Sequence, residues 1–232
     1  MPPYRLEQED VAKRVANLFG ANRDVARLLQ QRWPAIRETA PELLAFHHTA
    51  AERNRIAAEM WLRAGEAALR RFALSEAVTH LRTGLSALSK LRPSKTRDRI
   101  ELSLRTALGP AVVAQRGWGE AEVNQVLEPA WRLAQSLQQH TAYLPILNAL
   151  AVHYMCMGRL EQSLRWADRL LDAGAELDDN RLKVVGYRAA SASQFWRRLS
   201  RCRSQRAAPR PSLRPRFCAH TGRTGFRISP RS

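Results

Sequence analysis

Apolar residues recur three or four positions apart through most of the chain, as they do on the buried face of an α-helix. Short connections, several of which contain Gly or Pro, separate these stretches. The pattern therefore predicts an all-α protein. The longer predicted helices span Arg55–Arg71, Ser75–Lys90, Arg97–Gln115, Glu120–Gln139, Tyr143–Cys156, Leu160–Gly174 and Leu182–Trp196.

Small residues stand where two paired helices would cross. In the stretch from Trp61 to Leu88, Gly65 lies in the first predicted helix, and Ala77 and Gly84 lie in the second. Helix axes lie about 8–10 Å apart, so a crossing point favours Gly or Ala. A large residue followed by small ones 4, 16 and 23 positions later is the spacing of a tetratricopeptide-type repeat.

The same features recur with a nearly constant period. The small residue of the first helix returns at intervals of 44, 42 and 40, and that of the second helix at 44 and 42. We therefore predict a tetratricopeptide-like helical-hairpin solenoid over residues 51–196, after a helical lead-in over residues 1–50. The two series are Gly65, Gly109, Ala151 and Ser191, and Ala77, Ala121 and Ser163; the turns are Phe72–Leu74, Arg116–Gly119 and Met157–Arg159.

The repeat pattern stops at Arg197. If Ser191 marks a fourth unit, its turn falls near Arg197–Leu199 and a second helix is expected, but residues 197–232 show no helical period. We predict a disordered, Arg-rich tail over 197–232. Arginine without lysine, mixed with Ser, Pro and Gly, suggests a GC-rich coding frame read out of phase. The other interpretation is a genuine basic tail that binds nucleic acid or an acidic partner.

Charge and composition narrow the function classes. Of the 38 Lys and Arg residues, 11 lie in residues 197–232, which contain no Asp or Glu, so +11 of the net charge of +17 belongs to the tail and +6 to residues 1–196. A nucleic-acid partner is therefore expected only if the tail is genuine. No apolar run approaches the ~20 residues of a membrane span, and the N-terminus has no secretory h-region. Three cysteines without metal-ligand spacing favour a reduced, cytoplasmic setting.

The sequence offers little catalytic chemistry. No glycine belongs to a GxxxxGK[ST] phosphate-binding loop. His47 and His48 are adjacent, so they point about 100° apart on a helix and cannot easily share one metal ion; we expect one to pack beside Leu44 and the other to be solvated. His153 is assigned to hairpin packing, and Cys156 to the core. We predict no catalytic residue, no metal and no cofactor.

Three stretches resemble one bacterial family: WPAIRETAPELLAFHHTAA, WLRAGEAALRRFALSEAVTHLRTGLSAL and ELSLRTALGPAVVAQRGWGEAEVNQV. The family comprises large adenylate or guanylate cyclase-like proteins with a class III cyclase domain, an AAA/STAND-type ATPase module and C-terminal repeats. The resemblance covers about residues 25–196. It implies a non-catalytic interaction or regulatory segment, a truncated remnant without activity of its own. The family's fourth unit continues with a Gly-Glu-Phe-like turn, where this chain has Arg197 and Arg198, which supports the out-of-frame interpretation.

A stacked-hairpin solenoid binds partners on its concave wall, which first helices line. Asn148 and Arg188 are expected to hold a peptide backbone or carboxylate there. The alternatives are a solvated face or a contact with the ATPase module of the family, and a nucleic-acid-binding adaptor that uses the tail. Phe195 and Trp196 end the repeats without a polar cap, which predicts self-association through that end. The candidate partner-binding residues are Glu59, Leu62, Glu66, Thr106, Asn148, Val152 and Arg188.

Overall fold

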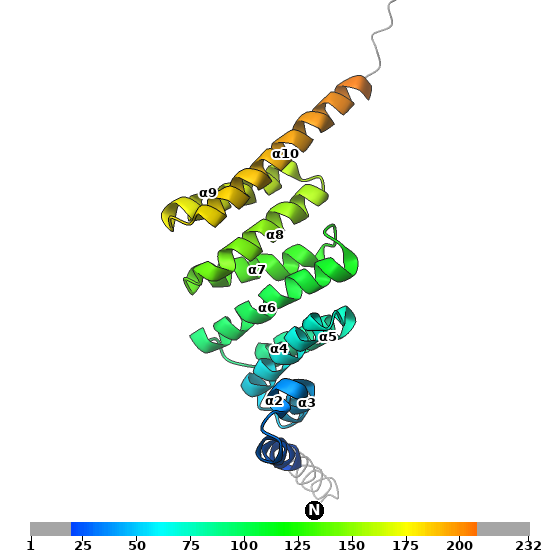
Figure 1. Ribbon diagram of the computed structural model, residues 1–232, viewed down its shortest axis with the longest axis vertical. Coiled ribbons are helices and arrows are strands. Elements are labelled where there is room, and N and C mark those ends of the chain that lie inside the picture. The colour runs from blue at the N-terminus through cyan, green and yellow to red at the C-terminus, as the bar shows by residue number, and fades with distance from the viewer. Residues whose placement is uncertain (1–19, 208–232) are drawn as a thin grey trace, which may run out of the picture. The chain divides into compact units, whose positions relative to one another are not determined.

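The computed structural model describes residues 20–207, and all regular structure in that range is helical (Figure 1). The predicted all-α class is confirmed. A helix over residues 20–32 comes first. It is followed by α2 (Ile36–Thr39), α3 (Pro41–Ala50), α4 (Asn54–Arg70), α5 (Leu74–Ser89), α6 (Lys95–Arg116), α7 (Glu122–Ser136), the 3₁₀ turn η1 (His140–Ala142), α8 (Tyr143–Cys156), α9 (Leu160–Glu176) and α10 (Asn180–Ala207).

The bounds of the helices agree with the hydrophobic pattern, with one large exception. Helix α8 has the predicted bounds, but α10 continues to Ala207. The prediction of disorder over residues 197–207 is therefore wrong. These residues contain Arg, Ala, Gln and Leu and neither Pro nor Gly, so nothing in their sequence stops a helix that has already formed. The rest of the predicted tail, residues 208–232, and residues 1–19 of the lead-in lie outside the described residues.

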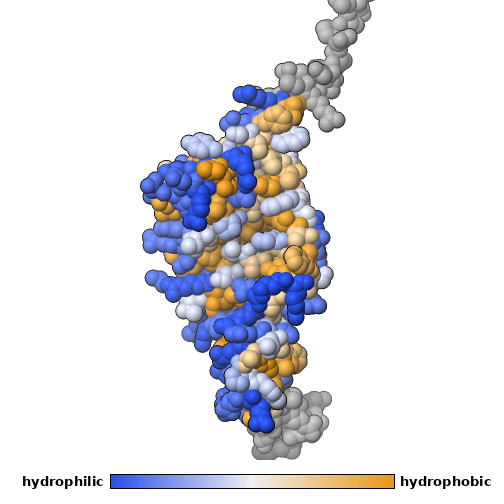
Figure 2. Space-filling view, in the orientation of Figure 1, coloured by the Kyte–Doolittle hydropathy of each residue, from blue (hydrophilic) through white to orange (hydrophobic). Residues whose placement is uncertain are grey.

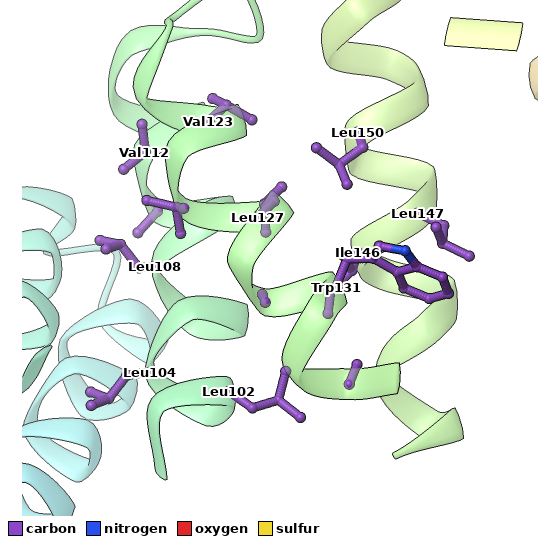
Figure 3. Packing of buried hydrophobic residues seen from close by; sticks show 14 of the residues in the cluster. Leu102, Leu104, Leu108, Val112, Val123, Leu127, Trp131, Ile146, Leu147 and Leu150 are labelled. Atoms are coloured by element: carbon purple, nitrogen blue, oxygen red, sulfur yellow. The ribbon is translucent and has the colours of Figure 1, made fainter. Parts of the chain in front are cut away.

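Consecutive helices pack on each other from α3 to α9, and α4, α6 and α8 also contact one another in sequence order. Most buried apolar residues form one continuous cluster that runs from α4 to the start of α10. Figure 3 shows the middle of this cluster, where Leu104 and Leu108 extend to one side of α6, Leu127 belongs to α7, and Trp131 meets Ile146 of α8. A smaller cluster includes Ile36, Leu44, Ala45 and Met60. The hairpins are therefore joined by shared packing rather than by isolated loops.

The small residues allow the close helix crossings that their spacing predicts. A Cβ atom on Gly65 would lie 2.5 Å from Leu81 Cγ, and one on Gly109 would lie 2.5 Å from Leu127 Cδ2. In the third hairpin, Ser163 Oγ donates a hydrogen bond to the carbonyl oxygen of Ala151 at 2.6 Å. The backbones therefore approach too closely for a larger residue at these positions.

One member of the second series of small residues is misplaced. Ala121 is exposed because α7 begins only at Glu122, and the buried residue at the start of this helix is Val123. The prediction for Ala121 is wrong, because the pattern located the hairpin but not the residue at which the helix starts. Pro110 and Pro129 lie inside α6 and α7, and neither ends its helix.

Five helices end in the same hydrogen-bonded turn, in which a residue with positive φ follows the helix. After α4, Phe72 has φ of 58°, its N–H donates to Leu69 O at 3.0 Å, and the N–H of Ala73 donates to Ala68 O at 2.9 Å. This is the Schellman motif, which satisfies the last carbonyl groups of a helix. The equivalent residues elsewhere are Glu52, Gln138, Gly158 and Asp178.

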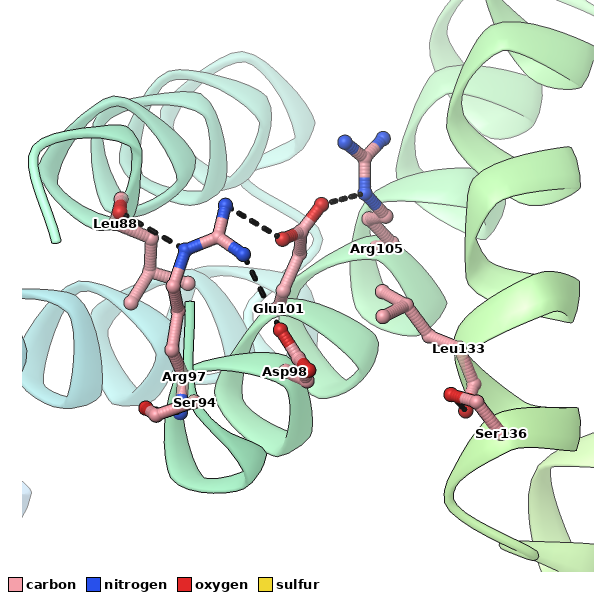
Figure 4. Close-up of polar contacts among 8 residues, drawn as sticks. All are labelled: Leu88, Ser94, Arg97, Asp98, Glu101, Arg105, Leu133 and Ser136. Carbon is pink, nitrogen blue, oxygen red and sulfur yellow. Dashed lines mark hydrogen bonds and ion pairs between the residues drawn. The ribbon is translucent and has the colours of Figure 1, made fainter. Parts of the chain in front are cut away.

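The connection between α5 and α6 is held by a polar network (Figure 4). Ser94 caps α6 by accepting a hydrogen bond from the N–H of Arg97 at 3.2 Å. The Arg97 guanidinium donates to the Leu88 carbonyl oxygen at the end of α5 and pairs with Glu101 at 3.2 Å. Glu101 also accepts from Arg105 at 2.8 Å. Arg97 therefore ties the end of one helix to the beginning of the next.

Candidate functional site

Three cavities lie along the helices that come first in each hairpin. We call the residues that line them the first-helix surface. The cavities are bordered by α8 and α10, by α4, α6 and the start of α8, and by α2, α3 and α4. Each includes at least one residue that the sequence assigned to partner binding, so the surface is the natural candidate for a site.

The cavity between α8 and α10 has a volume of about 190 Å³ and is almost entirely apolar. At its edge, Arg188 Nη2 donates a hydrogen bond to Asn148 Oδ1 at 3.3 Å. The hydroxyl of Ser163 is directed into the packing, where it bonds the Ala151 carbonyl at 2.6 Å and the Ser193 hydroxyl at 2.8 Å. The cavity thus combines one polar pair with apolar walls. The apolar lining consists of Ala151, Val152, Met155, Ala189 and Ala192.

The second cavity has a volume of about 430 Å³ and is more polar. Glu66 of α4 and Thr106 of α6, two of the predicted partner-binding residues, both line it. Thr106 Oγ1 donates its hydrogen to the Leu102 carbonyl at 2.8 Å, so toward the cavity it offers an acceptor. The remaining lining residues are Leu102, Ser103, Ala107, Gln139, Thr141, Ala142 and Pro145.

The third cavity, of about 330 Å³, adjoins the second at Glu66, which lines both. Three guanidinium groups, those of Arg37, Arg63 and Arg70, line it with the carboxylates of Glu38 and Glu66. Arg63, Glu66 and Arg70 are three and four positions apart, so they share one face of α4. Arg37 comes from α2 and has no such spacing to reveal it. The sequence therefore missed the positive charge beside Glu66.

The seven predicted partner-binding residues lie in different surroundings. Glu66, Thr106, Asn148, Val152 and Arg188 line cavities, and Asn148 and Arg188 contact each other. Glu59 instead pairs with Arg55 of the same helix at 2.6 Å. Leu62 packs, partly buried, against the main core. Five of the seven residues therefore line cavities, and the other two make contacts within the chain.

The two adjacent histidines separate as the helix geometry requires. His47 is half-buried and its Nδ1 lies 2.9 Å from Asn22 Oδ1. His48 is buried, and no group within residues 20–207 hydrogen-bonds its Nδ1. Burial, and then the positive charges of Arg53 and Arg37, lower the pKa of His48 from 6.5 to about 4. His48 is therefore neutral near pH 7.

The predictions for His153 and Cys156, which placed both side chains in the packing, have opposite outcomes. His153 is buried, and its Nδ1 lies 2.6 Å from the carbonyl oxygen of Trp118, so its predicted packing role is confirmed. Cys156 is exposed, so its assignment to the core is wrong. It is the last residue of α8, and the core-facing side of that turn is occupied by His153 and Tyr154. Within residues 20–207, no three His, Cys, Asp or Glu side chains are grouped as metal ligands.

The chain was compared with known protein families, proteins and structures. No protein-family model, no curated protein and no solved structure matches it. Among the helices of residues 20–207, none is both long and apolar enough to span a bilayer.

Proposed function

We propose that the chain is a non-catalytic, tetratricopeptide-like solenoid segment that binds a peptide of another protein on the first-helix surface. The observation that carries the proposal is the cavity between α8 and α10, where Asn148 and Arg188 form a polar pair beside apolar walls. A few placed polar groups in an otherwise apolar cavity are the usual composition of a ligand site.

The polar pair leaves hydrogen-bonding capacity for a ligand. Asn148 Oδ1 accepts from Arg188, and within residues 20–207 no group bonds the two N–H donors of the Asn148 amide or the other guanidinium donors, which leaves them for oxygens of a peptide. These donors fit a backbone carbonyl or a carboxylate, while the cavity accepts an apolar side chain. Glu66 lines both the second cavity and the arginine-lined cavity. Its carboxylate favours a positively charged side chain farther along the peptide.

The proposed setting is a signalling protein of the cyclase and ATPase type. It is supported by the sequence stretches of residues 25–196 that resemble the junction and repeats of that family. In such a protein the segment binds a partner or an adjoining module, and this binding regulates a catalytic domain elsewhere in the protein. A nucleic-acid-binding adaptor rests on residues 197–232, most of which lie outside the described residues, and stays a prediction from the basic composition.

Panning a random-peptide phage library on the purified chain tests the binding proposal. We expect enriched peptides to bind Asn148→Ala and Arg188→Ala with affinities about fivefold or more weaker, because each variant removes a hydrogen bond worth about 1–1.5 kcal/mol. Arg165→Ala, an exposed arginine on α9, is the matched control and should leave the affinity unchanged. Enriched peptides that bind all three variants equally well would contradict the proposal.

A further inference from the structure

Helix α10 carries an apolar stripe that the described part of the chain leaves uncovered. Val184, Tyr187 and Phe195 are 66%, 65% and 59% exposed, and Ser191 between them is also exposed. Their spacings of three and four place them on one side of the helix. Trp196, 54% exposed, stacks edge-on against Phe195. Part of the apolar surface over α10 is visible in the space-filling view (Figure 2).

In the other first helices, the residues at the equivalent positions are covered by neighbouring elements. Counting back by the repeat intervals of 40, 42 and 44 residues gives the equivalent positions in α8, α6 and α4, and every one of them is buried or half-buried. They are Leu144, Leu147, Ala151 and Met155; Leu102, Arg105, Gly109 and Val113; and Ala58, Trp61, Gly65 and Leu69.

In each of these hairpins the following helix supplies the cover. Leu81 of α5 presses on Gly65, Leu127 of α7 presses on Gly109, and Ser163 of α9 bonds the backbone of Ala151. Ser191 holds the same place in α10. The opposite side of α10 is already occupied by α9, because a Cβ atom on Gly186 would lie 2.7 Å from Leu171 Cδ2. The exposed stripe is thus the half of α10 that a further helix would complete.

Charge distinguishes the possible occupants of the stripe. Residues 180–197 of α10 include Arg181, Lys183, Arg188 and Arg197 and no acidic residue. Arg181 and Lys183 pair with Asp179 and Asp178 of the preceding turn. Arg188, beside the stripe, contacts the neutral amide of Asn148. A second copy would bring its own Arg188 to the stripe and no acidic residue of this helix segment to balance it, which opposes the self-association that the sequence predicted. One cation of this segment already meets an acid of the neighbouring helix, because Arg197 pairs with Glu161 of α9 at 3.2 Å.

We propose that the α10 stripe is a docking surface for an amphipathic helix of a partner protein, with an apolar face against Tyr187 and Phe195 and acidic residues along its flanks. The partner helix takes the place that α9 takes on α8. Arg188, seven positions before Phe195, lies beside this stripe and also lines the cavity between α8 and α10, so the two surfaces adjoin. The variants at Tyr187 and Phe195 leave Asn148 and Arg188 unchanged, so the two proposals are tested separately.

The probe is a fluorescent synthetic peptide of the α9 sequence, residues 160–176, which covers the equivalent stripe on α8 and carries four acidic residues. Titrated with the full chain, it is expected to bind, and the double variant Tyr187→Ser/Phe195→Ser is expected to weaken binding about tenfold or more. Both side chains are exposed, so the variant keeps its fold. The variants Phe72→Ser and Met157→Ser, which remove exposed apolar side chains at helix ends, are the matched controls and should bind as the wild type does.

A second peptide tests the charge. Changing Glu161, Asp168, Asp172 and Glu176 of the probe to Lys should lower its affinity about tenfold, with a smaller difference at high salt. Sedimentation velocity of the chain without peptide should show a monomer. The proposal is overturned if the α9 peptide does not bind, if the double variant binds it equally well, or if the Lys peptide binds as tightly. A dimer that the double variant dissociates would also overturn it and assign the stripe to a second copy.

Discussion

Helices α8 and α10 carry equivalent apolar stripes in different surroundings. On α8, Leu147 is fully buried, and in Figure 3 it points to the side opposite Ile146 and α7. On α10, the equivalent Tyr187 is 65% exposed. The two helices have the same position in their hairpins, but only α8 is followed by a covering helix among the described residues. The difference shows that an apolar pattern reports which face of a helix can pack, and that the next element decides whether it does.

The largest effect should come from truncating one residue of each stripe. Leu147→Ala removes a fully buried side chain and should lower the free energy of unfolding by about 2–5 kcal/mol. Tyr187→Ala removes an exposed side chain and should change it by less than about 0.5 kcal/mol. Urea denaturation of both variants measures the difference. Equal losses would mean that the two stripes are buried alike in solution.

Acid should destabilise the protein through a group that belongs to neither stripe. Because the pKa of His48 is lowered to about 4 in the folded state from 6.5, the unfolded state binds a proton first as the pH falls. The contribution of neutral His48 is complete above pH 6.5 and is lost between pH 6.5 and about 4, at about 1.4 kcal/mol per pH unit and up to about 3 kcal/mol.

Urea unfolding at about pH 7 and about pH 5 measures this loss. In His48→Gln the histidine contribution should disappear, whereas in Tyr187→Ala it should persist, since Tyr187 lies far along the chain from α3. A His48→Gln variant with the same pH dependence as the wild type would show that other groups control the acid response.

A smaller difference in stability is expected between substitutions of two equivalent small residues, Gly65 of α4 and Ser191 of α10. Gly65→Val adds a Cβ atom that would lie 2.5 Å from Leu81 Cγ, together with two methyl groups, and should cost about 1–3 kcal/mol. Ser191→Val adds an apolar side chain to an exposed position and should be nearly neutral. Thermal unfolding monitored by circular dichroism compares them, and a neutral Gly65→Val would argue against the close crossing of α4 and α5.

The smallest predicted effect is a gain in stability. Phe72 is 87% exposed and has φ of 58°, a conformation in which Gly avoids the steric cost of a side chain. Phe72→Gly should therefore stabilise the first hairpin by up to about 1 kcal/mol. Urea midpoints measure the gain, and the same change at Phe195, inside α10, should instead destabilise by a similar amount because Gly is unfavourable within a helix. A loss of stability in Phe72→Gly would indicate that the exposed ring makes a contact in solution.

Much of the helical architecture followed from local signals. The period of apolar residues located the helices, and Gly65 and Gly109 located two of the closest crossings. The pattern failed where a single residue decides the outcome. The start of α7 made Ala121 exposed, and the end of α8 made Cys156 exposed. The helical residues beyond Trp196 were missed because their polar composition hides helix propensity when no apolar face is present.

The candidate site was predictable in part for a similar reason. Asn148 and Arg188 are 40 residues apart, one predicted repeat interval, so the pattern that aligned the helices put both on the same face of successive first helices, and the structure adds the hydrogen bond between them. Arg37 is outside the repeats, and its position beside Arg63 depends on how α2 packs against α4. No periodicity connects them. The face of a periodic helix was therefore accessible from sequence, and the contacts made with the lead-in were not.

Hydrogen exchange of the full chain, with and without the α9 peptide, tests most directly whether the α10 stripe is an incomplete packing surface. The account predicts that amides of α8, covered on both sides, exchange more slowly than those of residues 184–196 in α10, and that the peptide slows exchange in residues 184–196. Protection of α10 equal to that of α8 without peptide, or no change in α10 at saturating peptide, would contradict the account.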